Sequence, residues 1–394
     1  MKIAHIITRM IIGGAQENTL YNCLDLVRDH GDEVVLITGP ATGPEGDLLR
    51  QHDLTGLTIR EVPSLIRSIN PFSDVTSYRA IKKAIADFKP DVVHTHSAKA
   101  GMLGRFAAWN LRIPAVIHTV HGAPFHPYQS WAARKFFIAC ERYAAKRCHH
   151  LISVADAMTD LMLNAHVASR EKFTTIYSGM DIEPFLHADD HRARVRLQFG
   201  FREDDVVIGK IARLFHLKGH DDLIASAQEV VAKVPQAKFL LVGDGILRDE
   251  LTADIALRGL TKHFVFAGLV PPSEVPALIG AMDILVHTSL REGLARALPQ
   301  GLLAGKPVVS YDIDGAREVV INNETGALIT PRDVKTLAAS LSDLAQNPTL
   351  REKLGRAGQG RCKIRFDHRE MTRQIRALYD SVLTGAKKQI SQAL

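Results

Sequence analysis

The sequence predicts an α/β protein built from two Rossmann-like, doubly wound domains that face a central cleft. Its 394 residues exceed the roughly 250–300 at which a single hydrophobic core stops growing. Short β-rich apolar runs alternate with stretches of helical spacing, as in parallel sheets covered on both faces. The alternation starts again after a charge-dense stretch at residues 187–205. We therefore expect one domain at 1–185, a second at 186–365, and a C-terminal helix with a tail at 366–394.

The expected elements follow one another in a regular order. Strands are predicted at 3–8, 33–37, 91–95, 115–120 and 151–154, and again at 206–211, 238–242, 264–267, 283–287 and 307–311. Residues 15–28 and 78–88 have the 3.6-residue apolar spacing of helices. Residues 363–383 read as a terminal helix that could pack back on the N-terminal domain, and 385–394 as a loosely ordered tail.

Composition narrows the class of protein. The four cysteines lack CxxC spacing, which suits reduced thiols rather than disulfides or a zinc site. Residues 1–8 read as a strand and not as a signal peptide, and no apolar run approaches the length of a membrane span, so we expect a cytoplasmic protein. The net charge of +6 favours an anionic partner, which could be a phosphate ligand or a lipid surface. Nucleic-acid binding would be supported by the charge alone, so it is not expected.

Several strand ends carry residues suited to phosphate. Gly13 and Gly14 lie between the first strand and a helix, where glycine allows close backbone approach and a helix N-terminus offers N–H groups; a plain architectural turn is the alternative. Arg213 and Lys218 follow the strand at 206–211 and could neutralise a diphosphate, although each could also be a solvated surface cation. Residues 243–245 and 266–271 end two further strands in glycine-containing loops.

The order of these motifs resembles that of retaining glycosyltransferases of family 4, which have the GT-B fold. The resemblance runs through nearly the whole chain, and its motifs are Gly13-Gly14, His121-Gly122, residues 176–181, Arg213 with Lys218-Gly219, Gly243-Asp244-Gly245, Glu292-Gly293 and residues 304–308. It implies a hexosyltransferase-like enzyme with an N-terminal acceptor domain and a C-terminal nucleotide-sugar domain. Cell-envelope polysaccharide biosynthesis is the expected setting.

The resemblance also implies roles for particular residues. His121 would reach the donor sugar, Arg213 and Lys218 would hold the diphosphate, and Glu292 would lie near the reacting sugar. The residues implied for donor binding are Gly13, Gly14, Gly243, Asp244, Gly245, Val270, Gly293, Leu294, Ala295, Arg296 and Gln300. For Glu292 the alternative is a carboxylate that stabilises a helix N-terminus. Arg296 could either add charge to the donor site or pair with Glu292.

Position 300 departs from the family pattern. The family has a second glutamate there, which accepts hydrogen bonds from the ribose, whereas this chain has Gln300. An amide still offers one carbonyl acceptor. The loss of a charged acceptor could weaken nucleotide binding by roughly 1–2 kcal/mol.

Transfer is expected to retain the anomeric configuration and to need no cofactor and no metal, because Arg213 and Lys218 can stabilise the leaving diphosphate. Asp312 and Asp314 have the letters of a DxD motif but are expected to lie away from this grip. His94 and His96 could suggest a metal, yet no carboxylate motif accompanies them, so a cleft or packing role is favoured; His118 shares this ambiguity.

A basic helix at 128–149 is the candidate membrane contact. Cations at 134, 135, 142 and 146 are expected on one face beside Tyr128 and Trp131, with Phe136, Phe137, Cys140 and Tyr143 opposite. This pattern would suit peripheral contact at the inner face of a membrane and a lipid-linked acceptor, while a solvated basic face is the alternative.

The donor, a UDP- or GDP-sugar, and the acceptor, a glycan, lipid-linked or small molecule, are not fixed by the shared motifs. Two other functions fit the same residues. One is a nucleotide-sugar epimerase of the same fold, and the other is a non-catalytic sugar-nucleotide-binding protein.

Overall fold

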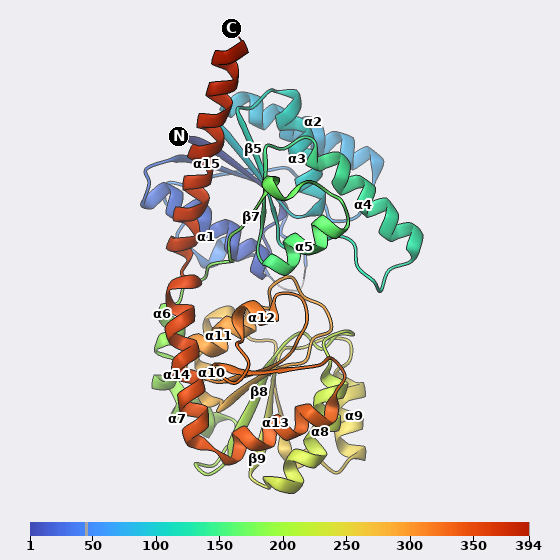
Figure 1. The fold of residues 1–394 in the computed structure, drawn as a ribbon, viewed down its shortest axis with the longest axis vertical. Helices are drawn as coiled ribbons and strands as arrows, with labels where there is room; N and C mark the ends of the chain where they lie inside the picture. Colours follow the sequence, from blue (N-terminus) through green and yellow to red (C-terminus); the bar gives the residue numbers. More distant parts are fainter. Residues whose placement is uncertain (44–45, 394) are drawn as a thin grey trace. The chain divides into compact units, whose positions relative to one another are not determined.

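The computed structural model describes residues 1–43 and 46–393, and within them it forms two compact units. Unit 1 is Met1–Met180 with Phe366–Leu394, and unit 2 is Asp181–Arg365. The division thus lies at residue 180, and the stretch at 187–205 belongs to unit 2. Each unit is an α/β layer structure with helices on both sides of a parallel sheet, so the predicted fold class is confirmed (Figure 1).

Unit 1 contains a sheet of seven strands in the order β3-β2-β1-β4-β5-β6-β7 within the described residues. The strands are β1 (Lys2–Arg9), β2 (Glu33–Gly39), β3 (Thr58–Glu61), β4 (Val92–His96), β5 (Ala115–Val120), β6 (His150–Ser153) and β7 (Phe173–Thr175). The helices are α1 (Gly14–Arg28), α2 (Pro71–Phe88), α3 (Ala98–Asn110), α4 (Trp131–Ala145), α5 (Asp156–Asn164) and α15 (His368–Ala393), with 3₁₀ turns η1 (Leu48–Gln51) and η2 (Arg170–Lys172).

Unit 2 has a six-stranded sheet in the order β10-β9-β8-β11-β12-β13, again counting the described residues. The strands are β8 (Val206–Ile211), β9 (Ala237–Val242), β10 (Phe264–Gly268), β11 (Ile284–His287), β12 (Val308–Tyr311) and β13 (Gly326–Ile329). The helices are α6 (Glu183–Leu186), α7 (Arg192–Gln198), α8 (His220–Lys233), α9 (Arg248–Leu257), α10 (Val275–Ala281), α11 (Ala297–Leu303), α12 (Ala316–Val319), α13 (Val334–Gln346) and α14 (Pro348–Arg365), with η3 (Ala188–His191), η4 (Thr261–His263) and η5 (Pro272–Glu274).

The end of the chain differs from the expectation. Residues 363–365 belong to α14, and residues 366–367 interrupt the helical structure. Helix α15 then continues through residues 385–393, where a loose tail was predicted. Polar contacts fasten α15 to α1: His368 Nδ1 lies 2.8 Å from Asp25 Oδ2, and Thr372 Oγ1 donates to the same carboxylate. These contacts hold the first turn of α15 against α1.

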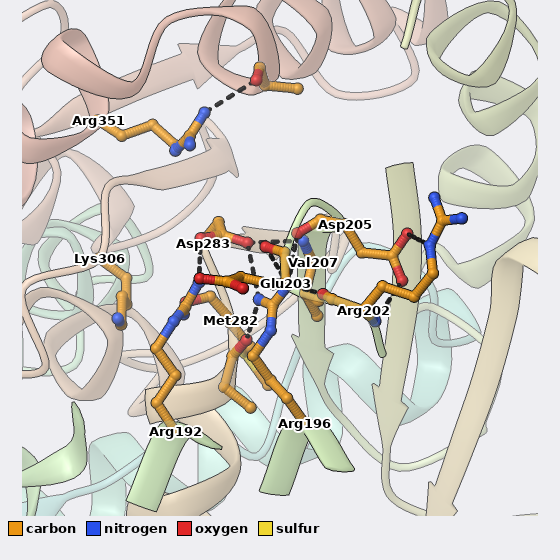
Figure 2. Close-up of polar contacts among 12 residues, drawn as sticks. Arg192, Arg196, Arg202, Glu203, Asp205, Val207, Met282, Asp283, Lys306 and Arg351 are labelled. Carbon is orange, nitrogen blue, oxygen red and sulfur yellow. Dashed lines mark hydrogen bonds and ion pairs between the residues drawn. The ribbon is translucent and has the colours of Figure 1, made fainter. Parts of the chain in front are cut away.

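A partly buried ion network ties α7 to the sheet of unit 2. Asp283, just before β11, accepts hydrogen bonds from Arg192 (2.7 Å), Arg196 (3.3 Å) and the backbone N–H of Val207 at the start of β8 (2.8 Å). Figure 2 shows both guanidinium groups directed at this carboxylate. Arg196 also donates to the backbone oxygens of residues 202 and 205. The charges in residues 187–205 therefore build unit 2 rather than a solvated linker.

Helix α4 is shorter than the predicted 128–149, and two of the aromatic side chains expected opposite the cations are exposed. Its inward residues are Glu141, Ala144 and Ala145, because Glu141 pairs with the buried Arg105 over 3.0 Å. Phe136 and Tyr143 are 59% and 52% exposed. No helix within the described residues is both long enough and apolar enough to cross a bilayer.

Candidate functional site

The candidate site of unit 2 lies where the strand order reverses. β8 and β11 are neighbours in the sheet although two strands, β9 and β10, lie between them in the sequence, and ligands of such sheets bind beyond the carboxyl ends of the strands at this point. The loop after β8 carries Arg213 and Lys218, and the loop after β11 carries Glu292. Two of the predicted catalytic residues are thus brought together from loops 74 residues apart.

Lys218 and Glu292 form an ion pair at the centre of this site. Lys218 Nζ lies 2.5 Å from Glu292 Oε1, and His287 Nε2, at the end of β11, lies 3.4 Å from the same oxygen. Burial alone would raise the pKa of Glu292, but the contacts with His287 and Lys218 outweigh it and hold that pKa well below its usual range. Glu292 is therefore a carboxylate, and Lys218 is a cation already directed into the site.

A second lysine, which the sequence analysis missed, lies beneath this pair. Lys210 is fully buried in β8, and its Nζ donates to Thr288 Oγ1 over 2.8 Å. The Thr288 hydroxyl in turn donates to the backbone oxygen of Gly219. Burial, with repulsion from Lys218, lowers the pKa of Lys210 to about 7. The signal in the sequence is a lysine inside an otherwise apolar strand.

Glycines allow the loops of this site to pack against one another. Gly219 has φ +64°, and a Cβ there would lie 2.0 Å from the backbone oxygen of Thr288. Gly243 has φ +133°, and a Cβ there would lie 2.2 Å from the oxygen of Ala212. Because no other residue fits these contacts, the glycines are needed for backbone packing in the absence of any ligand. Asp244 belongs to the same packing, since its backbone oxygen accepts from Leu214 N over 3.0 Å.

The remaining predicted donor residues surround these loops. The Arg213 guanidinium lies 4.9 Å from the ring centre of Phe215. Val270 follows β10, and Arg296 precedes α11, on which the half-buried Gln300 lies. Gly293, Leu294 and Ala295 form the connection between Glu292 and α11, and Gly245 follows β9.

Asp314 lies beside Glu292, contrary to the expectation that it would be far from the diphosphate grip. Its Oδ2 accepts a hydrogen bond from the backbone N–H of Glu292 over 2.6 Å. The reason is that β12 pairs directly with β11, so the loops after these two strands are neighbours. Asp314 adopts φ +45°, a conformation that Asp tolerates better than most residues. Asp312 is paired with Arg317 instead.

In unit 1 the predicted His121 is the outer end of a chain of histidines. His121 Nε2 lies 3.0 Å from His96 Nδ1, and His96 Nε2 lies 3.0 Å from His5 Nδ1. His94 contacts Tyr379 OH at 2.5 Å and Thr119 Oγ1 at 2.7 Å. Ligand atoms of His5, His94 and His96 lie within 4.8 Å of one another, but these hydrogen bonds already account for their positions.

The proton positions along this chain depend on one another. Burial lowers the pKa of His5 to about 3 and that of His96 well below 6.5, so both rings are neutral and each carries one N–H. If His5 donates to His96, then His96 donates to His121 Nε2; if His121 donates, the whole chain reverses. The tautomer of the predicted catalytic histidine is therefore coupled to buried rings on β1 and β4.

Gly13 and Gly14 form the turn into α1. Gly13 is the N-cap residue in an extended conformation, and no side-chain hydrogen bond caps the helix there. A Cβ at Gly13 would meet only the flexible end of Gln16 at 2.8 Å. Glycine is thus not required at this position by packing within the chain.

Comparisons with known proteins agree with this architecture. Residues 12–184 match the family model Glycosyltransferase Family 4, and residues 192–361 match Glycosyl transferases group 1. A relative from Escherichia coli, UDP-Gal:alpha-D-GlcNAc-diphosphoundecaprenol alpha-1,3-galactosyltransferase, is 27% identical over 356 residues, which cover 89% of each chain. The putative glycosyltransferase EpsD of Bacillus subtilis is 27% identical over 82% of this chain and 85% of its own.

Solved structures show the same fold. Anabaena HepE in complex with UDP matches with a TM-score of 0.81 at 23% identity, over 97% of this chain and 100% of that chain. WaaG, a glycosyltransferase involved in lipopolysaccharide biosynthesis, matches with a TM-score of 0.74 at 16% identity, over 97% and 99%.

Proposed function

Because the chain belongs to glycosyltransferase family 4 and has the GT-B fold, we propose that it moves a hexosyl group from a UDP- or GDP-sugar to a lipid-linked or glycan acceptor, with retention of configuration. Sugar transfer from a nucleotide sugar is the activity of the family, and the donor, the stereochemistry and the acceptor are the proposed parts. The observation that carries the donor part of this proposal is the contact between Lys218 and Glu292 at the switch point of unit 2, where the loop of Lys218 also carries Arg213.

The chemistry requires positive charge at the leaving diphosphate. As the bond to the anomeric carbon breaks, negative charge grows on the phosphate oxygens, and preorganised cations stabilise it. Lys218 and Arg213 supply such charge, and Lys210 lies beneath them. Donor binding would exchange the Lys218–Glu292 contact for a contact between Lys218 and phosphate, which frees Glu292 to accept hydrogen bonds from the sugar.

We also propose that transfer needs no metal ion. Of the two carboxylates beside the grip, Asp314 is engaged by the Glu292 amide, and Glu292 would turn to the sugar hydroxyls once the donor is bound. Positive charge at the diphosphate is supplied by side chains instead.

A lipid-linked acceptor is supported by two observations. The Escherichia coli relative is named for an acceptor on diphosphoundecaprenol. On this chain, α4 exposes Trp131 (71%), Phe136 (59%) and Tyr143 (52%), with Lys135 Nζ 4.0 Å from the Trp131 ring. Exposed aromatics among cations suit a helix that rests on an anionic membrane surface. We propose that this helix makes peripheral contact with the cytoplasmic face of the membrane.

Donor specificity and transfer can be tested separately. A thermal-shift screen of UDP-, GDP- and ADP-sugars should identify the donor, and Lys218→Ala should lose most of the shift, whereas the exposed Lys233→Ala on α8 should not. Release of UDP or GDP without acceptor, lost in Lys218→Ala, would exclude a non-catalytic binding protein. Conversion of the donor to its epimer with no glycoside formed would instead identify an epimerase and refute the proposal.

Membrane contact needs its own test. Co-sedimentation with anionic vesicles at low salt should fall in Trp131→Ala and Lys135→Ala, and stay unchanged in Phe72→Ala, whose exposed ring lies on α2. Failure of the unmodified protein to bind vesicles would rule out the membrane contact without affecting the assignment of sugar transfer.

A further inference from the structure

The histidine chain of unit 1 lies at the switch point of its sheet. His5 is on β1 and His96 ends β4, and these two strands are neighbours where the strand order reverses. His121 follows β5, the next strand of the sheet. His5 and His96 are fully buried, whereas His121 is partly exposed. The chain therefore leads from the interior of the sheet to the carboxyl end of β5, where ligands of such sheets bind.

The three rings meet edge to edge. His5 Nδ1 lies 3.0 Å from His96 Nε2, and His96 Nδ1 lies 3.0 Å from His121 Nε2. The ring centres are 5.2 Å and 5.3 Å apart, and the ring planes differ by 14° and 28°. These separations are close to the largest that two imidazoles can have at such N···N distances, so each contact is an in-plane N–H···N hydrogen bond. In each contact one nitrogen must donate and the other must accept.

The inner end of the chain determines its direction. Among the described residues, no nitrogen or oxygen forms a hydrogen bond with the buried His5 Nε2. If the chain ran inward from His121, the neutral His5 would accept at Nδ1 and carry its proton on Nε2, as an N–H buried without an acceptor. If His5 donates from Nδ1 instead, Nε2 is an unpaired acceptor, which protein interiors tolerate better than an orphaned N–H. The chain is therefore expected to run outward, from His5 through His96 to His121.

We propose that His96 is a positioning residue that holds His121 as its Nδ1–H tautomer. His96 donates from Nδ1 to His121 Nε2, which leaves the His121 proton on Nδ1. Because Nε2 is occupied by His96, Nδ1 is the nitrogen with which His121 meets a ligand. His121 then contacts the donor sugar as a hydrogen-bond donor and not as a proton acceptor. The part that concerns the sugar rests on the proposed sugar transfer.

NMR of the full chain labelled with ¹⁵N-histidine tests the tautomer directly. Long-range ¹H–¹⁵N correlation gives different peak patterns for a proton on Nδ1 and a proton on Nε2, and the signals that disappear in His121→Gln identify the ring. His121 should show the Nδ1–H pattern in the protein without ligand. A His121 ring with its proton on Nε2 would overturn the proposal, and this result needs no variant of the buried histidines.

Variants separate the hydrogen bond from the packing of the core. His96→Phe keeps a ring but removes the donor, so His121 should move to the Nε2–H form that free imidazole side chains favour. His5→Phe is the matched control, because it removes an equally buried ring. It makes His96 Nε2 the unpaired inner end, so His121 should keep the Nδ1–H form. A change of tautomer in both variants, or in neither, would refute a specific role for His96.

Kinetics connect the tautomer to the reaction. His96→Phe should lower kcat/KM for sugar transfer by about tenfold, the effect of one hydrogen bond. His96→Asn should recover most of this loss, because its amide can donate from the place of the ring Nδ1. Equal losses in the two variants would contradict the hydrogen-bond role. A chain that has the Nδ1–H tautomer but transfers no sugar would refute sugar transfer alone, whereas the opposite tautomer would refute the role of His96 whatever the activity.

Discussion

Replacing Lys210 by Met should stabilise the protein at low pH, and the gain should shrink as the pH rises. Lys210 is fully buried, with one hydrogen bond of 2.8 Å to Thr288. Burial lowers its pKa from 10.5 to about 7. Below pH 7 the lysine is charged in both the folded and the unfolded chain, so the folded chain bears the full cost of burying that charge. Methionine has a similar length and no charge.

The size of the effect follows from proton linkage. Between pH 7 and 10.5 the folded chain releases the proton while the unfolded chain keeps it, so the unfolded state binds more protons and stability rises with pH. The free energy of unfolding of the wild type should rise by about 1.36 kcal/mol for each pH unit above the folded pKa. Relative to Lys210→Met, this amounts to roughly 3 kcal/mol between about pH 6 and about pH 9.

Urea unfolding of both proteins across this pH range measures the gap between them. Lys238→Met is the matched control, because Lys238 lies on the neighbouring β9 but is only partly buried, and its replacement should leave the pH dependence of stability unchanged. A gap between wild type and Lys210→Met that stays constant, or widens in favour of the variant toward pH 9, would refute the reasoning.

Three further outcomes are expected. Asp283→Asn should lower the free energy of unfolding by about 3–5 kcal/mol, because it leaves Arg196 buried without its carboxylate; calorimetry measures this, and a loss below about 1 kcal/mol would contradict it. Gly219→Ala should destabilise unit 2 and abolish the donor-induced thermal shift, whereas Gly360→Ala on α14, where a Cβ meets nothing within 4 Å, should do neither. Nitrogen-detected NMR should find His96 neutral at a pH below the ordinary pKa of histidine, since burial lowers its pKa; a protonated ring near neutral pH would be incompatible with the histidine chain.

The central strands could be predicted from the sequence to within one or two residues. They are apolar on both faces, so their runs stand out from the flanking helices. The three strands that were missed, β3, β7 and β13, are all at sheet edges, have three or four residues, and leave part of their side chains exposed. A short half-exposed strand carries little periodic signal.

The sequence indicated which residues belong to the site, but not which of them contact one another. Motif order indicated Lys218 and Glu292, but not their partners: the pairing of β11 with β12 brings Asp314 to Glu292, and His287 reaches Glu292 from the end of β11 itself. His5 was missed for the same reason, because its contact with His96 joins two strands 91 residues apart. Such neighbours depend on strand order, which a single sequence does not reveal.

Strand order alone would give the two units equivalent sites, so the side chains decide their roles. In unit 1 the buried groups at the switch point are histidine rings that burial keeps neutral, which cannot balance a leaving diphosphate. In unit 2 the switch point holds Lys218, whose partner Glu292 fixes its direction, and the buried Lys210 on β8. The cations that can stabilise a leaving diphosphate therefore lie in unit 2.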